Sequence, residues 1–209
     1  MKNLLKTSLT TALVAGLMVF AASAAKADPV TFSTTASFNG GAFSSPNAIV
    51  FGASGNQLSL TFTGVTNSMV NTVGGFTFAS LGEIQTATTG TGATITAGTT
   101  FAIRVTQTVP SGGTGDFSGT ISGTIGPNSS TGQITFTVTH VDINGVQYDV
   151  QNNPLALVPP STNNGVTSIQ ARITTPAAVP EPASMLLLGT GLAGLAGAVR
   201  RKVRARNQN

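Results

Sequence analysis

The most constraining feature of this 209-residue chain is a strict alternation of apolar and polar residues through its middle part. In QLSLTFTG (57–64) and TFAIRVTQTV (100–109), almost every second side chain is leucine, isoleucine, valine or phenylalanine. Successive side chains of a β-strand point to opposite faces, so a period of two predicts strands with one buried face. Further strands are predicted in VTFSTTASF, NAIVFG, GGFTFASLG, ATITA, QITFTVTHV and VTSIQARI.

Glycine, asparagine, serine and proline separate these segments, as in SGGTGD (111–116) and GPNSSTG (126–132), which we interpret as turns. No stretch between residues 28 and 179 combines helical periodicity with helix caps. Many short strands in this region predict an all-β domain over residues 28–175, an antiparallel β-sandwich or jelly-roll-like fold. Because tryptophan is absent, phenylalanine is expected to supply most of the aromatic core.

The segment HVDINGVQYDV gives the clearest local prediction. Asn144 and Gly145 tolerate the positive φ angles of a two-residue type I′ turn, which predicts a β-hairpin. Counting outward from this turn pairs His140 with Asp149, and it places Asp142 on the same face of the hairpin. The single histidine of the chain is therefore expected to lie beside two carboxylates.

This polar cluster has two interpretations. His140 and Asp149 could act as an acid–base pair, or Asp142 and Asp149 could bind a cation. The alternative, a polar outer face of a hairpin, is favoured because no nucleophile motif accompanies the cluster. Ile134, Phe136 and Val138 lie an even number of residues before His140, so strict alternation would place them on the same face as this polar side chain. Either a β-bulge near Val138 or a strand that is apolar on both sides would explain this.

The net charge of +4 does not indicate a nucleic-acid-binding protein, because most of the positive charge lies at the two ends of the chain. Between residues 28 and 179 there is no lysine, and the charged residues are two arginines, Arg104 and Arg172, and five acidic residues. A phosphate-binding face needs clustered basic residues, so no nucleic-acid partner is expected. Cysteine is absent, which excludes cysteine zinc sites, thiol catalysis and disulfides. We expect no metal and no cofactor.

The first 27 residues have the layout of a secretory signal peptide, with two lysines, an apolar stretch and small residues at Ala25 and Ala27. Cleavage is expected after Ala27, with a cut after Ala24 as the alternative. An N-terminal membrane helix fits less well, because the apolar run from Leu9 to Ala22 is short and a polar, turn-rich segment follows it.

A second apolar run, residues 183–199, lies near the C-terminus. Its 17 residues would span about 25 Å as a helix, at the short edge of what crosses a bilayer. The basic tail that follows, residues 200–209, would hold this end in the cytoplasm and leave the domain outside. This membrane stop signal consists of Arg200, Arg201, Lys202 and Arg204. A helix of the domain core is excluded because the run has no polar face.

The segment Val179-Pro180-Glu181-Pro182, within a proline-rich linker of residues 176–182, precedes this run. Together with the apolar run and the arginines it resembles the PEP-CTERM sorting domain, and a GPI signal fits less well because it has no basic end. The resemblance implies an exported protein of a Gram-negative bacterium, transiently anchored in the inner membrane and then at the cell surface or extracellular. It also implies recognition of Pro180, Glu181 and Pro182 by a membrane-embedded exosortase.

The domain itself resembles the choice-of-anchor domains of the K type, through FGASGNQLSLTFTG, FTFASLGEI and TFAIRVTQTVP. The resemblance implies a secreted β-rich module that is attached to one of several surface anchors.

These features favour a non-enzymatic surface or extracellular-matrix protein, associated with exopolysaccharide or biofilm. One alternative is a carbohydrate-binding or adhesion module, although Tyr148 is the only tyrosine or tryptophan that could stack on a sugar ring. A hydrolase would need paired carboxylates, for which only Asp142 and Asp149 lie close in the predicted hairpin. Ice binding would need T-x-T spacing at a fixed repeat, and the threonines show no constant period.

Overall fold

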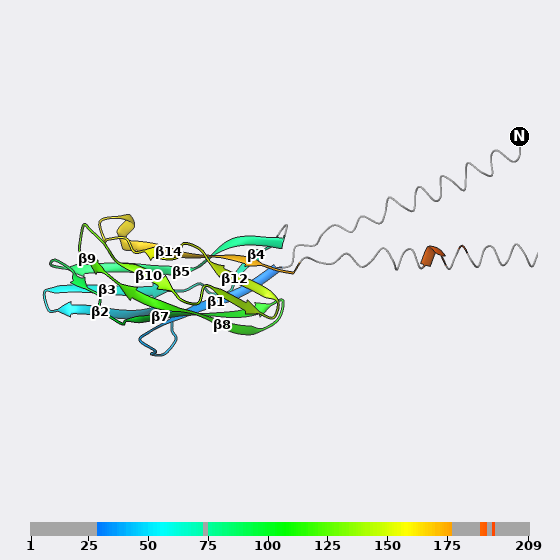
Figure 1. The fold of residues 1–209 in the computed structure, drawn as a ribbon, viewed down its shortest axis with the longest axis horizontal. Helices are drawn as coiled ribbons and strands as arrows, with labels where there is room; N and C mark the ends of the chain where they lie inside the picture. The colour runs from blue at the N-terminus through cyan, green and yellow to red at the C-terminus, as the bar shows by residue number, and fades with distance from the viewer. Residues whose placement is uncertain (1–28, 73–74, 177–188, 192–193, 195–209) are drawn as a thin grey trace, which may run out of the picture. The chain divides into compact units, whose positions relative to one another are not determined.

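The computed structural model describes residues 29–72, 75–176, 189–191 and 194. The domain is one compact unit, Ala27–Pro176. Its described residues form two curled antiparallel sheets of six strands each and a small two-stranded sheet (Figure 1). The prediction of an all-β domain built from antiparallel strands is therefore confirmed.

The first sheet has the strand order β13 (Leu155–Ala156), β10 (Gln133–Phe136), β8 (Gly113–Ser122), β7 (Thr100–Val109), β1 (Pro29–Phe38) and β4 (Ser68–Asn71). The second has the order β11 (His140–Ile143), β12 (Val146–Val150), β14 (Val166–Thr174), β5 (Phe76–Thr89), β3 (Asn56–Thr63) and β2 (Asn47–Ala53). The small sheet pairs β6 (Ala93–Thr94) with β9 (Thr124–Ile125). A 3-10 turn, η2 (Asn163–Gly165), precedes β14.

The two large sheets enclose one core to which both contribute. Phe32 of the first sheet meets Tyr148 of the second edge to face, with ring centroids 5.8 Å apart, and Phe62 meets Phe101 in the same way at 5.9 Å. The phenylalanines buried in this core are Phe32, Phe38, Phe51, Phe62, Phe101, Phe117 and Phe136. The expectation of a phenylalanine-rich aromatic core is confirmed, because burial of each ring removes a large apolar surface from water.

The long strand β5 contains a β-bulge at Leu81, which shifts the alternation of buried and exposed side chains by one residue. Ser80 pairs with Gln170 and Gly82 pairs with Ile169, so Leu81 is the extra residue and its side chain is buried. Gly82 has φ 127°, and a Cβ there would overlap the ring of the neighbouring Phe62. Glycine is therefore needed at this position, and the bulge lets the outward residues of both halves of β5 share one face.

The segment QITFTVTHV is two strands, not the single strand that its alternation predicts. β10 ends at Phe136 in the first sheet, and β11 begins at His140 in the second, so residues 137–139 carry the chain between the sheets. Because of this crossing, the alternation of β10 does not continue into β11, and buried Phe136 and exposed His140 can be four residues apart. The N–H groups of Thr137 and Val138 both donate to Ser118 O, at 2.8 and 3.1 Å, so the chain is irregular at Val138 as a bulge would make it. The segment is not, however, the one continuous strand that both explanations assumed.

The segment SGGTGD is only partly the turn that its composition predicts, because β8 begins at Gly113. Gly113 and Gly115 lie under the opposite sheet, where a Cβ would overlap the side chains of Ile143 and Val141 respectively. The glycines therefore permit a close approach of β11 to β8, a long-range contact that turn propensity does not reveal. The predicted turn at residues 126–132 is a loop between β9 and β10.

The signal peptide with Ala25 and Ala27, the sorting segment from Val179 to Pro182 and the basic tail from Arg200 lie outside the described residues. Of the predicted membrane run, residues 189–191 and 194 are described, and these are helical. Within the part of the chain that the structure describes, no helix is long and apolar enough to cross a membrane.

Candidate functional site

The β11–β12 hairpin has the register that the sequence predicts. His140 pairs with Asp149 and Ile143 with Val146, and both turn residues have positive φ angles, 52° at Asn144 and 87° at Gly145. Val141, Ile143 and Tyr148 face the core, while His140 and Asp142 face solvent. The Asn-Gly turn therefore fixes which side chains reach the outer surface of the second sheet.

Of the predicted polar cluster, the structure brings two members together. His140 Nδ1 lies 2.7 Å from Asp149 Oδ1, with the two side chains 52% and 39% exposed. Asp142 instead stabilises the turn, since its Oδ1 accepts a 2.9 Å hydrogen bond from the Gly145 N–H. Within the described residues no group of three or more metal-ligating side chains is found. An exposed pair of this kind contributes about 0–1 kcal/mol to stability.

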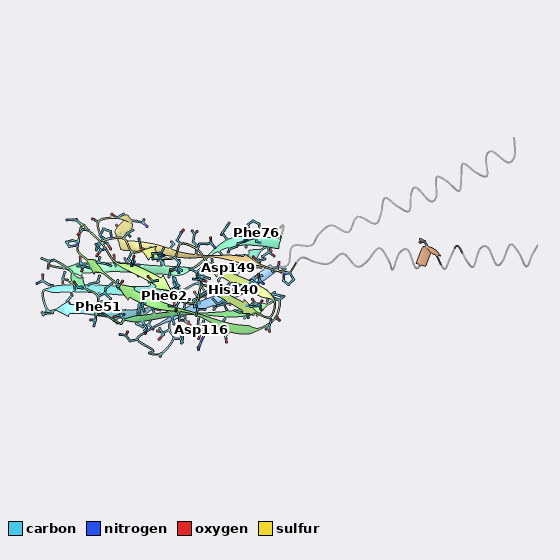
Figure 2. The ribbon with its side chains drawn as sticks, viewed as in Figure 1. Phe51, Phe62, Phe76, Asp116, His140 and Asp149 are labelled. Carbon is cyan, nitrogen blue, oxygen red and sulfur yellow. The ribbon has the colours of Figure 1, made fainter. Side chains whose placement is uncertain are left out.

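Two phenylalanines of β5 and an arginine of β14 lie beside this hairpin on the outer face of the second sheet, and Figure 2 labels one of them, Phe76. The Arg172 guanidinium carbon lies 4.3 Å from the centroid of the Phe76 ring, a cation–π contact. Phe76 and Phe78 meet edge to face at 6.0 Å and are 42% and 57% exposed. We call Phe76, Phe78 and Arg172 the aromatic surface. The exposure of these rings could not be predicted from the sequence, because alternating phenylalanines in a strand usually mark a buried face.

A groove of about 350 Å³ lies on the outer face of the first sheet. Its lining includes the two phenylalanines Phe43 and Phe101 and five side chains with hydroxyl groups, which are Ser37, Thr100, Ser118, Thr120 and Thr137. Phe43 belongs to the loop between β1 and β2. Asn47 of β2 holds that loop, because its Nδ2 donates to Ala36 O at 2.7 Å and to Ala42 O at 3.0 Å.

A bidentate ion pair lies beside this groove. Arg104 of β7 donates from Nε to Asp116 Oδ1 at 2.8 Å and from a terminal nitrogen to Oδ2 at 2.7 Å. The hydrogen bonds to Asp116 raise the pKa of Arg104, and its guanidinium carbon lies 4.0 Å from the centroid of the Phe43 ring. The sequence does not predict this pair, because the composition of SGGTGD indicates a turn at Asp116, although Arg104 occupies an outward position of an alternating strand.

Tyr148, the one tyrosine that could have stacked on a sugar ring, cannot serve as such a platform. Its side chain is fully buried, and its hydroxyl donates a 2.7 Å hydrogen bond to Gln107 Oε1. Gln107 in turn donates to Ser111 O at 2.9 Å and to Ile143 O at 3.3 Å. Burial raises the pKa of Tyr148, because a phenolate would be costly in this apolar surrounding. Tyr148 is a core residue.

Comparison with known families identifies the C-terminal segment. Residues 178–202 match the family model of the PEP-CTERM protein-sorting motif, which confirms the resemblance seen in the sequence. The match includes Val179 to Pro182 and the basic residues Arg200, Arg201 and Lys202. No curated protein and no solved structure matches the chain. The motif implies an exported protein that an exosortase processes and sorts to the cell surface.

Proposed function

Because the chain carries a PEP-CTERM protein-sorting motif at its C-terminus, we propose that it is a non-enzymatic surface or extracellular-matrix protein associated with exopolysaccharide or biofilm. The motif is the observation that carries the proposal. The signal peptide exports the chain, residues 183–199 hold it in the inner membrane, and the exosortase cuts near Glu181. The product is the β domain, which we assign to the β-sandwich class with a jelly-roll-like arrangement.

The residue chemistry of the linker supports this course of events. Pro180 and Pro182 restrict the backbone to extended conformations and disfavour helix at the residue before each of them. A motif with this restricted backbone next to the apolar run suits recognition of Glu181 by an enzyme embedded in the membrane. The basic residues from Arg200 oppose further translocation, because cytoplasmic ends of membrane segments carry excess lysine and arginine.

Replacement of Glu181 tests the proposal in cells. We expect Glu181→Ala to accumulate in the membrane fraction as an unprocessed species, while the wild-type domain reaches the surface or the medium. Glu83→Ala is the matched control, because Glu83 is the only other glutamate and is exposed on β5. Equal release of wild-type, Glu181→Ala and Glu83→Ala proteins would contradict a role of the motif in sorting.

The groove beside Phe43 supports a second candidate function, the binding of a neutral polysaccharide. Serine and threonine hydroxyls offer neutral donors and acceptors, and the charges of Arg104 and Asp116 compensate each other. The half-buried ring of Phe43 supplies an apolar surface next to these groups. Such a combination of an aromatic ring with neutral hydroxyl groups suits a sugar better than a charged ligand.

Binding to immobilised exopolysaccharide distinguishes this candidate. Phe43→Ala should weaken binding by about tenfold or more, the loss that follows from truncating a central aromatic contact. Phe78→Ala is the control, because Phe78 is also an exposed phenylalanine but lies on the other sheet. Equal weakening by the two substitutions, or none by either, would exclude the groove as the binding site.

A further inference from the structure

The aromatic surface lies at the end of the domain where the chain leaves toward the sorting motif. Thr174, the last residue of β14, pairs with Phe76, and Arg172 pairs with Phe78. The next residue is still held, since the Thr175 N–H donates to Gly75 O at 3.1 Å. Figure 2 shows Phe76 at this end of the domain and Phe51 at the opposite end.

The length of the linker confines this end of the domain to the neighbourhood of the membrane. Eight residues, 175–182, separate β14 from the apolar run that begins at position 183. Fully extended, they span at most about 29 Å. While the run is anchored in the bilayer, the aromatic surface therefore lies within reach of the lipid head groups.

The side chains of this surface have the chemistry of a membrane interface. Two neighbouring phenyl rings are exposed, and Met69 of β4, a strand of the first sheet that contacts β5, is 68% exposed. Arg172 takes part in no ion pair within the described residues, because the nearby Asp149 is engaged by His140. A guanidinium is suited to bind lipid phosphate, and apolar side chains beside it partition into the head-group region.

We infer that the aromatic surface docks on the exported-side leaflet of the membrane that anchors the tail. Phe76 and Phe78 enter the head-group region and Arg172 binds lipid phosphates. The lipid surface is the occupant, because the linker places it next to these residues in every anchored molecule. This docking rests on the proposed anchoring of residues 183–199, and it would hold the linker at the level of the bilayer, where Glu181 meets the processing enzyme.

The absence of tryptophan from the chain permits a site-specific test. The full chain is reconstituted into phosphatidylcholine–phosphatidylglycerol vesicles with Phe78→Trp as the single tryptophan. Val50→Trp is the matched control, because Val50 is 55% exposed, close to the 57% of Phe78. Val50 pairs with Ser59, which pairs with Ala87, so it lies on the same sheet nine residues along β5 from the probe position Phe78. That separation corresponds to about 30 Å.

The expected result is a shift of Phe78→Trp emission to shorter wavelength and its quenching by brominated lipids, with Val50→Trp unaffected. Adding Arg172→Gln to Phe78→Trp should reduce the quenching. Equal quenching at the two positions, or none at either, overturns the inference. An emission shift that depends on protein concentration without lipid quenching also overturns it, since the occupant would then be a second copy of the chain.

Two controls keep these outcomes separate from other failures. Flotation of each variant with the vesicles shows that the tail is inserted, so a failure of docking is distinct from a failure of anchoring. Circular dichroism checks the fold. If Phe78→Trp does not fold, Phe76→Trp at the neighbouring position of the same surface gives the same readout.

Discussion

At the scale of single residues, Tyr148 shows how one buried polar group can give the domain a particular pH response. Its hydroxyl donates to Gln107 in the core, and burial raises its pKa above the ordinary value of 10.0. The unfolded chain loses the phenolic proton above pH 10 while the folded domain retains it. The unfolded state then binds fewer protons, so the free energy of unfolding must fall as pH rises.

We predict that the wild-type domain loses about 1.4 kcal/mol of stability per pH unit above pH 10, while Tyr148→Phe does not. Between residues 28 and 179 there is no lysine, no cysteine and no second tyrosine, so few other groups titrate there. Urea unfolding of both proteins at a series of alkaline pH values measures the difference. Parallel stability profiles for the two proteins would contradict the assignment of the effect to Tyr148.

Gly115 carries a second prediction at this scale. A Cβ at this position would overlap Val141 Cγ1, so Gly115→Ala should destabilise the domain by about 1–3 kcal/mol, the range for an overpacked core. Gly112→Ala is the control, because its Cβ would make only an ordinary contact with Gln107 O at 3.8 Å. Denaturant unfolding measures both substitutions, and a neutral Gly115→Ala would show that β11 does not approach β8 closely.

At the scale of elements, the β11–β12 hairpin carries an exposed pair, His140 and Asp149, which we expect to contribute little to the stability of the domain. We predict that His140→Ala changes the free energy of unfolding by no more than about 1 kcal/mol, because the partner Asp149 stays solvated when an exposed pair is broken. High salt should reduce even this difference. A decrease of several kcal/mol in the free energy of unfolding, or a decrease that high salt leaves unchanged, would contradict the interpretation of His140 and Asp149 as a weak surface pair.

The same elements show how much of the fold the sequence could predict. β7 coincides with the predicted segment 100–109, and β1 differs from its predicted segment by one residue, because alternation is a local property. The Asn144-Gly145 turn likewise set the hairpin register through local backbone preferences. The split between β10 and β11 could not be predicted, since it depends on which sheet each half joins.

The candidate surfaces were less predictable than the strands for the same reason. The pairing of Arg104 with Asp116 requires β8 to begin at Gly113, and that follows from the opposite sheet resting on its glycines. Predicting the exposure of Phe78 requires knowing which side of β5 faces the core. The bulge at Leu81 exchanges the inward and outward positions along this strand, so alternation alone does not show it. The sorting motif, in contrast, is a contiguous signal and was readable without any structure.

At the scale of the whole molecule, destination and fold are encoded in separate parts of the chain. The strands from β1 to β14 form a domain whose own charges are few, while the basic residues gather in the terminal segments. This domain has its own apolar core, to which both large sheets contribute. Its delivery depends on the short C-terminal segment that follows β14, which the PEP-CTERM motif occupies.

The intact mass of the exported protein tests the central claim most directly. The account predicts that the species recovered from the cell surface or medium lacks residues 1–27 and ends near Glu181, without the apolar run and the basic tail. An exported species whose mass still includes residues 183–209 would contradict processing at the sorting motif, and it would show that the tail is a permanent anchor.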